Sequence, residues 1–136
     1  MQFDTKIAVV VREDLAVWQK TNVVAFLCSG IAATVPDVVG EPYVDGSGHR
    51  YLPMFRQPVM VFGATPEGIR RAYERARARG VELAIYTAEL FSTGHDAANR
   101  DAVAAVPSEE LELVGLAMRA ERKLVDKVVD KLRPHP

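Results

Sequence analysis

Two polar segments have the residue types of a reactive or binding site, and each follows an apolar run. The first comes after Ile7–Val11 and the second after Val81–Tyr86. Ligands of open α/β sheets bind beyond the carboxyl ends of the strands, so both segments are candidate site regions. The candidate residues of the first segment are Arg12, Glu13, Asp14, Trp18, Gln19, Lys20 and Asn22. Those of the second segment are Thr87, Glu89, Ser92, Thr93, His95 and Asp96.

Structural roles compete with functional ones in the first segment. Asp14 precedes a helix-forming stretch, so we expect it to be the N-cap of that helix. Gln19 and Lys20 would then solvate an exposed first turn. Asn22 precedes an apolar run and needs a hydrogen-bond partner if it is buried.

The second segment contains the ingredients of nucleophilic catalysis. His95 stands beside Asp96, and Ser92 and Thr93 are close in sequence. A triad is defined by three-dimensional geometry and not by adjacency, whereas Ser and Thr are common turn and cap residues. We therefore expect a turn or cap role for Ser92 or Thr93.

Metal and phosphate chemistry have little support in the sequence. The three histidines, His49, His95 and His135, form no zinc-type spacing with Cys28. The Gly46-Ser47-Gly48 sequence lies in an expected hairpin and not between a strand and a helix, unlike a phosphate loop. We expect no metal and no cofactor. A run of arginines between positions 70 and 79 indicates a solvated helix face or, alternatively, a phosphate-contacting surface.

Composition limits the class of protein. The chain has 136 residues, 49% of them hydrophobic and 26% charged, which is typical of one globular domain, 1–136. A net charge of −1 gives no global attraction to nucleic acid or to an anionic membrane. The N-terminus has no secretory signal, and the apolar stretch 23–35 is too short to span a bilayer. We expect a cytoplasmic protein that does not enter membranes.

The order of elements predicts an α/β/α sandwich of three layers. Strands are expected at 7–11, 59–62, 81–86 and 111–118, and helices at 15–35, 66–79 and through the apolar positions 124–132. Thr65 and Pro66 indicate the start of the second helix, and Gly80 its end. The Pro/Gly-rich insertion 36–58 contains an expected small hairpin, and a short helix is expected before position 105. The first helix is apolar on nearly every side of its second half, which would suit packing against the sheet and a partner subunit.

Two sequence matches indicate a family. Val10-Val11-Arg12-Glu13-Asp14-Leu15, followed by a helix with Cys28-Ser29, resembles the type II peptidyl-tRNA hydrolases. The whole chain is more similar to an uncharacterised bacterial group of that fold, through segments 15–22 and 91–100. The resemblance implies a four-stranded mixed sheet between helices and a homodimer. The insertion 36–58 and the segments around Cys28 and Thr87 depart from the hydrolase pattern.

Three functions remain open. The resemblance implies hydrolysis of an ester in an aminoacyl- or peptidyl-tRNA or nucleotide, with Lys20 stabilising negative charge and Asp14 or Glu89 orienting a water molecule. Alternatively, the protein binds a small molecule in the crevice that would lie between the two polar segments if their strands were neighbours. Trp18 would then be an apolar wall, with polar contacts from Gln19, Asn22 and Thr93. A dimeric scaffold without a ligand is the third possibility.

Overall fold

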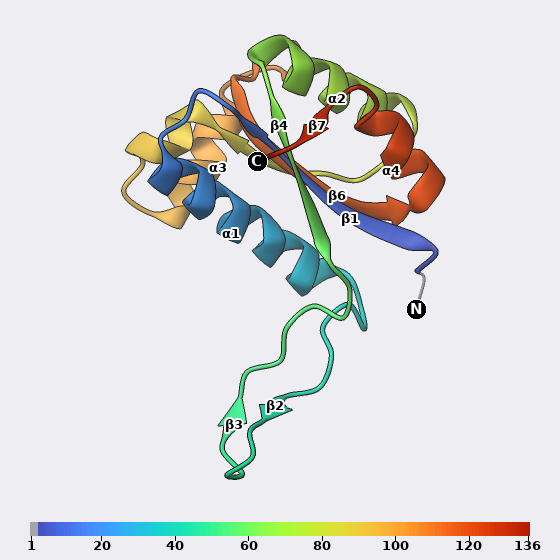
Figure 1. Cartoon of the computed structure of the whole chain (residues 1–136). Coiled ribbons are helices and arrows are strands. Elements are labelled where there is room, and N and C mark those ends of the chain that lie inside the picture. Colours follow the sequence, from blue (N-terminus) through green and yellow to red (C-terminus); the bar gives the residue numbers. More distant parts are fainter. Residues whose placement is uncertain (1–2) are drawn as a thin grey trace.

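A computed structural model describes residues 3–136 of the chain. These residues form a mixed sheet of five strands, four α-helices and a separate two-stranded hairpin (Figure 1). The strand order in the sheet is β5-β6-β1-β4-β7. The five strands are β1 (Thr5–Arg12), β4 (Val59–Ala64), β5 (Ala84–Thr87), β6 (Leu113–Glu121) and β7 (Arg133–Pro134). The expected number of four strands is therefore wrong by one, because the chain after the last helix returns to pair with β4.

The central strand β1 explains the topology. Ile7 to Val11 are at most 1% exposed, as expected for a β-branched run that is covered on both faces. On one side β1 pairs with β4 in parallel, and on the other side it pairs with β6 antiparallel. Because β5 is also antiparallel to β6, strands β1, β4 and β5 all run in the same direction.

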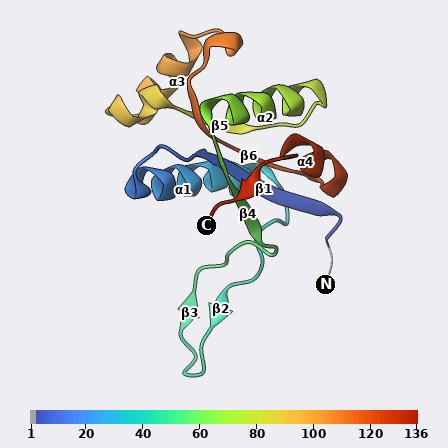
Figure 2. The ribbon, with the colours of Figure 1, turned by 45° about the horizontal axis from the view of Figure 1, so that its top comes forward.

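Helices pack on both faces of the sheet (Figure 2). On one face, α1 (Val17–Thr34) buries Val23, Leu27 and Ile31 against β1, β5 and β6. On the other face lie α2 (Pro66–Ala78) and α4 (Arg122–Val128). The 3₁₀ segments η1 (Ala88–Ser92) and η2 (Ser108–Glu110) flank α3 (Asp96–Ala104). None of the helices within residues 3–136 has the length and apolarity needed to cross a bilayer.

Local sequence signals define α2 well. The Thr65 side chain accepts a hydrogen bond from the Gly68 N–H, and Pro66 occupies the first turn, as expected. After the helix, Gly80 has φ +68°, which is a left-handed conformation that favours glycine.

Two helix boundaries differ from the expectation. Asp14 is not the N-cap of the first helix: the cap residue is Ala16, whose N–H donates to Gln19 Oε1 at 3.0 Å. Asp14 lies two residues too early and binds Arg12 instead. The last helix ends at Val128 and not near 132, and Lys131 takes φ +69° as the chain turns back into β7.

The 36–58 insertion contains a two-stranded hairpin. Strands β2 (Tyr43–Val44) and β3 (Arg50–Tyr51) pair antiparallel and project away from the body of the molecule (Figure 1). The Asp45 carboxylate orders the tip by accepting from the N–H groups of Ser47 and His49, and from the Tyr51 hydroxyl at 2.7 Å.

Gly115 in β6 allows α1 to approach the sheet closely, and this contact gives a stability prediction. A Cβ atom at Gly115 would lie 2.4 Å from Val23 Cγ1 and 3.0 Å from Leu27 Cδ1. We expect Gly115→Ala to lower the free energy of unfolding by about 1–3 kcal/mol through overpacking. Urea denaturation measures the change. Gly46→Ala is the control because a Cβ there meets nothing within 4 Å, and equal stability of the two variants would contradict the prediction.

Candidate functional site

The two candidate segments lie at one edge of the sheet. Strands β1, β4 and β5 point the same way, so Arg12, Ala64 and Thr87 end at this edge, which we call the carboxyl edge. The strands β1 and β5 are not neighbours, because β6 lies between them. The polar groups from the two segments are therefore separated by the width of one strand.

Arg12 and Asp14 form a charged pair at the end of β1. The Arg12 Nη2 atom lies 2.6 Å from Asp14 Oδ2, and Nε lies 3.0 Å from Oδ1. The Glu112 carboxylate is 3.6 Å from Arg12 Nη1. The hydrogen bond from Arg12 lowers the pKa of Asp14 and raises the pKa of the guanidinium. Asp14 is thus a fixed anion, which makes it a weaker base than an unpaired aspartate.

Lys20 lies against a residue from the far end of the chain. Its Nζ atom is 3.1 Å from Nε2 of His135. The main chain holds this histidine in place, since the His135 N–H donates to the Val61 carbonyl at 2.9 Å. The His135 Nδ1 atom lies 3.1 Å from the Pro136 carbonyl oxygen. A neutral ring with its proton on Nδ1 satisfies both contacts, because Nε2 then accepts from the ammonium group.

Glu13 completes what we call the polar cluster: Glu13, Lys20 and His135. The Glu13 main chain pairs with Ala64, and its side chain folds over Gly63 of β4. A Cβ atom at Gly63 would lie 2.9 Å from Glu13 Oε1 and 3.3 Å from His135 Cδ2. Glycine is therefore needed at position 63 for these two side chains to approach the strand.

An aromatic group covers the other flank of α1. The ring centroids of Trp18 and Phe91 are 6.2 Å apart, those of Tyr86 and Phe91 5.1 Å, and those of Phe26 and Tyr86 5.8 Å. Burial raises the pKa of Tyr86, and a hydrogen bond with Asn22 opposes this rise. Asn22 thus has the partner that its position requires. Trp18 remains 65% exposed, so the apolar wall is open to solvent.

The other candidates have local roles or stand apart. Gln19 caps α1, Thr93 Oγ1 donates to the Leu90 carbonyl, and His95 Nδ1 accepts from the Ala98 N–H at the start of α3. Glu89 and Ser92 are exposed, and neither side chain has a hydrogen bond within the described chain.

Thr87 is 1% exposed, and its hydroxyl has no protein partner among residues 3–136. A β-bulge pairs it with Leu113, which belongs to the core beneath α2. Thr87 therefore lies on the sheet face opposite the aromatic group and the polar cluster.

The remaining features carry less chemistry. Within residues 3–136, no three acidic, histidine or cysteine side chains are grouped to bind a metal ion. Several α2 arginines are used for packing: Arg70 donates to the Ser108 carbonyl, Arg75 donates to the Asp130 carbonyl, and Arg77 lies over the Tyr73 ring. Burial raises the pKa of the Cys28 thiol, which keeps it protonated at neutral pH.

Sequence reasoning nominates Glu13 by its position after β1 but misses His135 as a member of the site. The histidine enters through the pairing of β7 with β4, a contact between distant parts of the chain. The one local signal was Gly63 inside a strand, because such a glycine indicates close approach of other groups.

Comparisons with known proteins agree with an uncharacterised family. No curated protein matches the chain. A solved structure of a protein of unknown function, Atu0240 from Agrobacterium tumefaciens strain C58, is 46% identical with a TM-score of 0.96. That match covers 99% of this chain and 100% of the other. The relation to type II peptidyl-tRNA hydrolases stays a prediction. The profile of DUF2000, a family described as proteins of unknown function, matches residues 5–136, and the chain belongs to that family.

Proposed function

We propose that this chain is a small-molecule-binding protein without catalysis of its own, and that its polar cluster binds the ligand. The observation that carries the proposal is the 3.1 Å contact between Lys20 Nζ and His135 Nε2. A ring that accepts this hydrogen bond through Nε2 carries no negative charge, so this partner does not cancel the positive charge of Lys20. The ammonium group has three N–H donors, and the described residues offer a hydrogen-bond acceptor to only one of them.

The neighbouring charges indicate the ligand class. The carboxyl edge carries the cations Arg12, Lys20 and Arg133 against the anions Glu13, Asp14 and Glu112. This balance lacks the cationic excess with which proteins bind a polyanion such as tRNA. A ligand with an acceptor for Lys20 and a donor for Glu13 fits better. Zwitterionic amino acids and small carboxamides have both groups.

The residues expected for hydrolysis have other partners. Asp14 is bound by Arg12, and Lys20 contacts His135. Glu89 lies on η1, beyond the end of β5, which is separated from β1 by β6. The ion pair that holds Asp14 and the separation of Glu89 from β1 support binding over catalysis.

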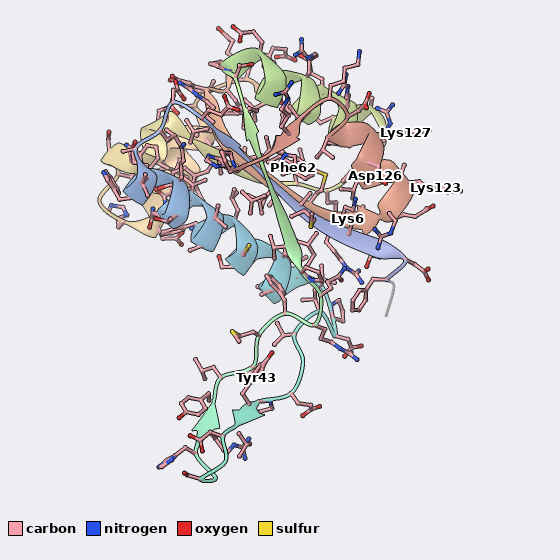
Figure 3. All side chains as sticks on the ribbon, in the orientation of Figure 1. Lys6, Tyr43, Phe62, Lys123, Asp126 and Lys127 are labelled. Atoms are coloured by element: carbon pink, nitrogen blue, oxygen red, sulfur yellow. The ribbon has the colours of Figure 1, made fainter. Side chains whose placement is uncertain are left out.

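Thermal shift tests the binding proposal. We expect at least one compound from a panel of zwitterionic amino acids and carboxamides to raise the Tm of the wild type. Lys20→Met should weaken binding of that compound by about tenfold or more, as one charged hydrogen bond is lost. The control is Lys123→Met, because Lys123 is an exposed lysine on α4 (Figure 3), and α4 packs on the opposite face of the sheet from α1. A panel without any binder, or equal shifts in wild type and Lys20→Met, would contradict the proposal.

A second candidate is hydrolysis of an ester in an aminoacyl- or peptidyl-tRNA or nucleotide, and the same contact favours it. His135 Nε2 has a free electron pair when Lys20 is turned away, so it would accept the proton of a water molecule that attacks the ester carbonyl. Lys20 would then stabilise the oxyanion, and the proton would pass from His135 to the departing alcohol.

Single-turnover cleavage of N-acetyl-aminoacyl-tRNA tests the hydrolase. This candidate predicts a rate loss of about 100-fold, or ~2.7 kcal/mol, in both Lys20→Met and His135→Gln. Lys123→Met should retain the full rate. Absence of cleavage at high enzyme concentration would exclude this substrate.

We further propose that the protein is a homodimer in which the hairpin packs on the partner. We call the protruding segment 43–54, which contains the hairpin, the arm. Five large apolar side chains on the arm are 50–84% exposed: Tyr43, Val44, Tyr51, Leu52 and Met54. Figure 3 shows Tyr43 on the arm, away from the body. Such a patch on a protruding segment is typical of an interface.

A second copy supplies a suitable surface for the arm. The exposed side of α1 carries Val17, Trp18 and Phe26, each more than half exposed. Lys20 is the one charged residue among the 18 of this helix, so an apolar arm meets little charge there. A two-fold axis would bury both arms and both helices through the same contact.

Sedimentation equilibrium tests the dimer. We expect Leu52→Ser with Tyr43→Ser to weaken dimerisation at least tenfold, because apolar contact area is lost. Glu41→Ser, an exposed polar change near the base of the arm, is the control. The single tryptophan, Trp18, should shift its emission to longer wavelength in the double variant. A monomeric wild type at high concentration would overturn the proposal.

A further inference from the structure

A cleft lies at the end of the sheet opposite the carboxyl edge and the polar cluster. It has a volume of about 540 Å³, which is in the range of small-ligand sites. The end of α1, the segment 80–84, the end of β6 and the side of α4 enclose it. Its lining is mostly apolar and includes Ile31, Val35, Leu83, Met118 and Leu124.

The cleft arises from unequal strand lengths. Pairing between β5 and β6 begins at Ala84 and Ala117, whereas β6 continues to Glu121. The chain from Gly80 to Leu83 therefore passes this end of β6 without pairing to it. A space bounded by side chains remains between this segment and the end of α1.

Arg119 is the cation of this cleft. It pairs with Ile7 of β1, whose side chain lies on the α1 face, so Arg119 points to the same face near the end of α1. Its Nε atom is buried and has no hydrogen-bond partner among the described residues. No carboxylate of the described chain lies within ion-pair distance of its guanidinium. A buried guanidinium N–H without an acceptor is unfavourable, and an anion would remove this penalty.

The cleft also contains one acid. Glu82 is part of the lining, is exposed, and forms no ion pair with Arg119 in the structure. Its carboxylate would repel an anionic ligand only weakly, because solvent screens the charge of an exposed group. Only one anionic group is therefore favoured, next to an apolar body.

We propose that this cleft binds a small monocarboxylate with a short unbranched hydrocarbon chain. Arg119 binds the carboxylate, because the guanidinium fork matches the two oxygens of that group. The hydrocarbon chain packs on Ile31, Leu83 and Leu124. The site is independent of the polar cluster, since Ile7 and Arg12 are five residues apart along β1, or roughly 17 Å.

Titration with octanoate, followed by calorimetry and by amide NMR shifts, tests the site. We expect saturable binding with the largest shifts at Ala84, Leu124 and their neighbours. Arg119→Met should weaken octanoate binding at least tenfold, and Arg119→Lys should weaken it less. Glu82→Gln should tighten it. Octanamide, which has the same chain without the charge, should bind at least tenfold more weakly than octanoate.

Arg71→Met is the matched control, because Arg71 is an exposed arginine on α2. Circular dichroism melting of each variant shows whether it is folded, and the Glu82→Gln gain is a result that misfolding would not produce. Three outcomes would overturn the proposal: no saturable octanoate binding, equal affinity for octanamide, or equal weakening by Arg71→Met.

Discussion

Pairing of β1 on both sides is the constraint on which the rest of the structure depends. The residues Ile7 to Val11 are buried on both faces, and their neighbours are fixed in opposite directions, β4 in parallel and β6 antiparallel. A slip of one residue would turn each side chain to the other face, exchanging the α1 side for the α2 and α4 side. The register therefore determines where Arg12 leaves the sheet and on which face Arg119 lies.

The polar cluster depends on the pairing of β7, the outermost strand on one side of the sheet, with β4. The strand β7 has only two residues, yet it pairs with Phe62 and Gly63 and continues through the His135 hydrogen bond to Val61. This pairing fixes the main chain of His135 against β4. The side chains of α1 and of the β1–α1 connection then meet the ring above Gly63, where no side chain occupies the space.

Local signals predicted much of the fold, whereas the site required contacts between distant segments. Thr65, Pro66 and Gly80 define α2 through interactions within a few residues, and the buried run of β1 is visible from composition alone. The expectation that Asp14 caps α1 is wrong, because an aspartate that caps a helix and an aspartate that binds Arg12 have the same sequence pattern. His135 could not be assigned, since a two-residue strand has no periodicity of its own.

The charge distribution of α1 connects the binding and assembly proposals. An exposed helix face normally carries charges that favour solvation, but 17 of the 18 residues here are uncharged, with Trp18 and Phe26 open to solvent. The sheet covers only the side with Val23, Leu27 and Ile31, so core packing does not explain the uncharged outer side. Burial of the outer side of α1 by a second copy of the chain does explain the lack of charges there. Lys20, two residues after Trp18, would then lie beside the interface. The contact of Lys20 with His135 in the polar cluster explains why this one position of the helix is charged.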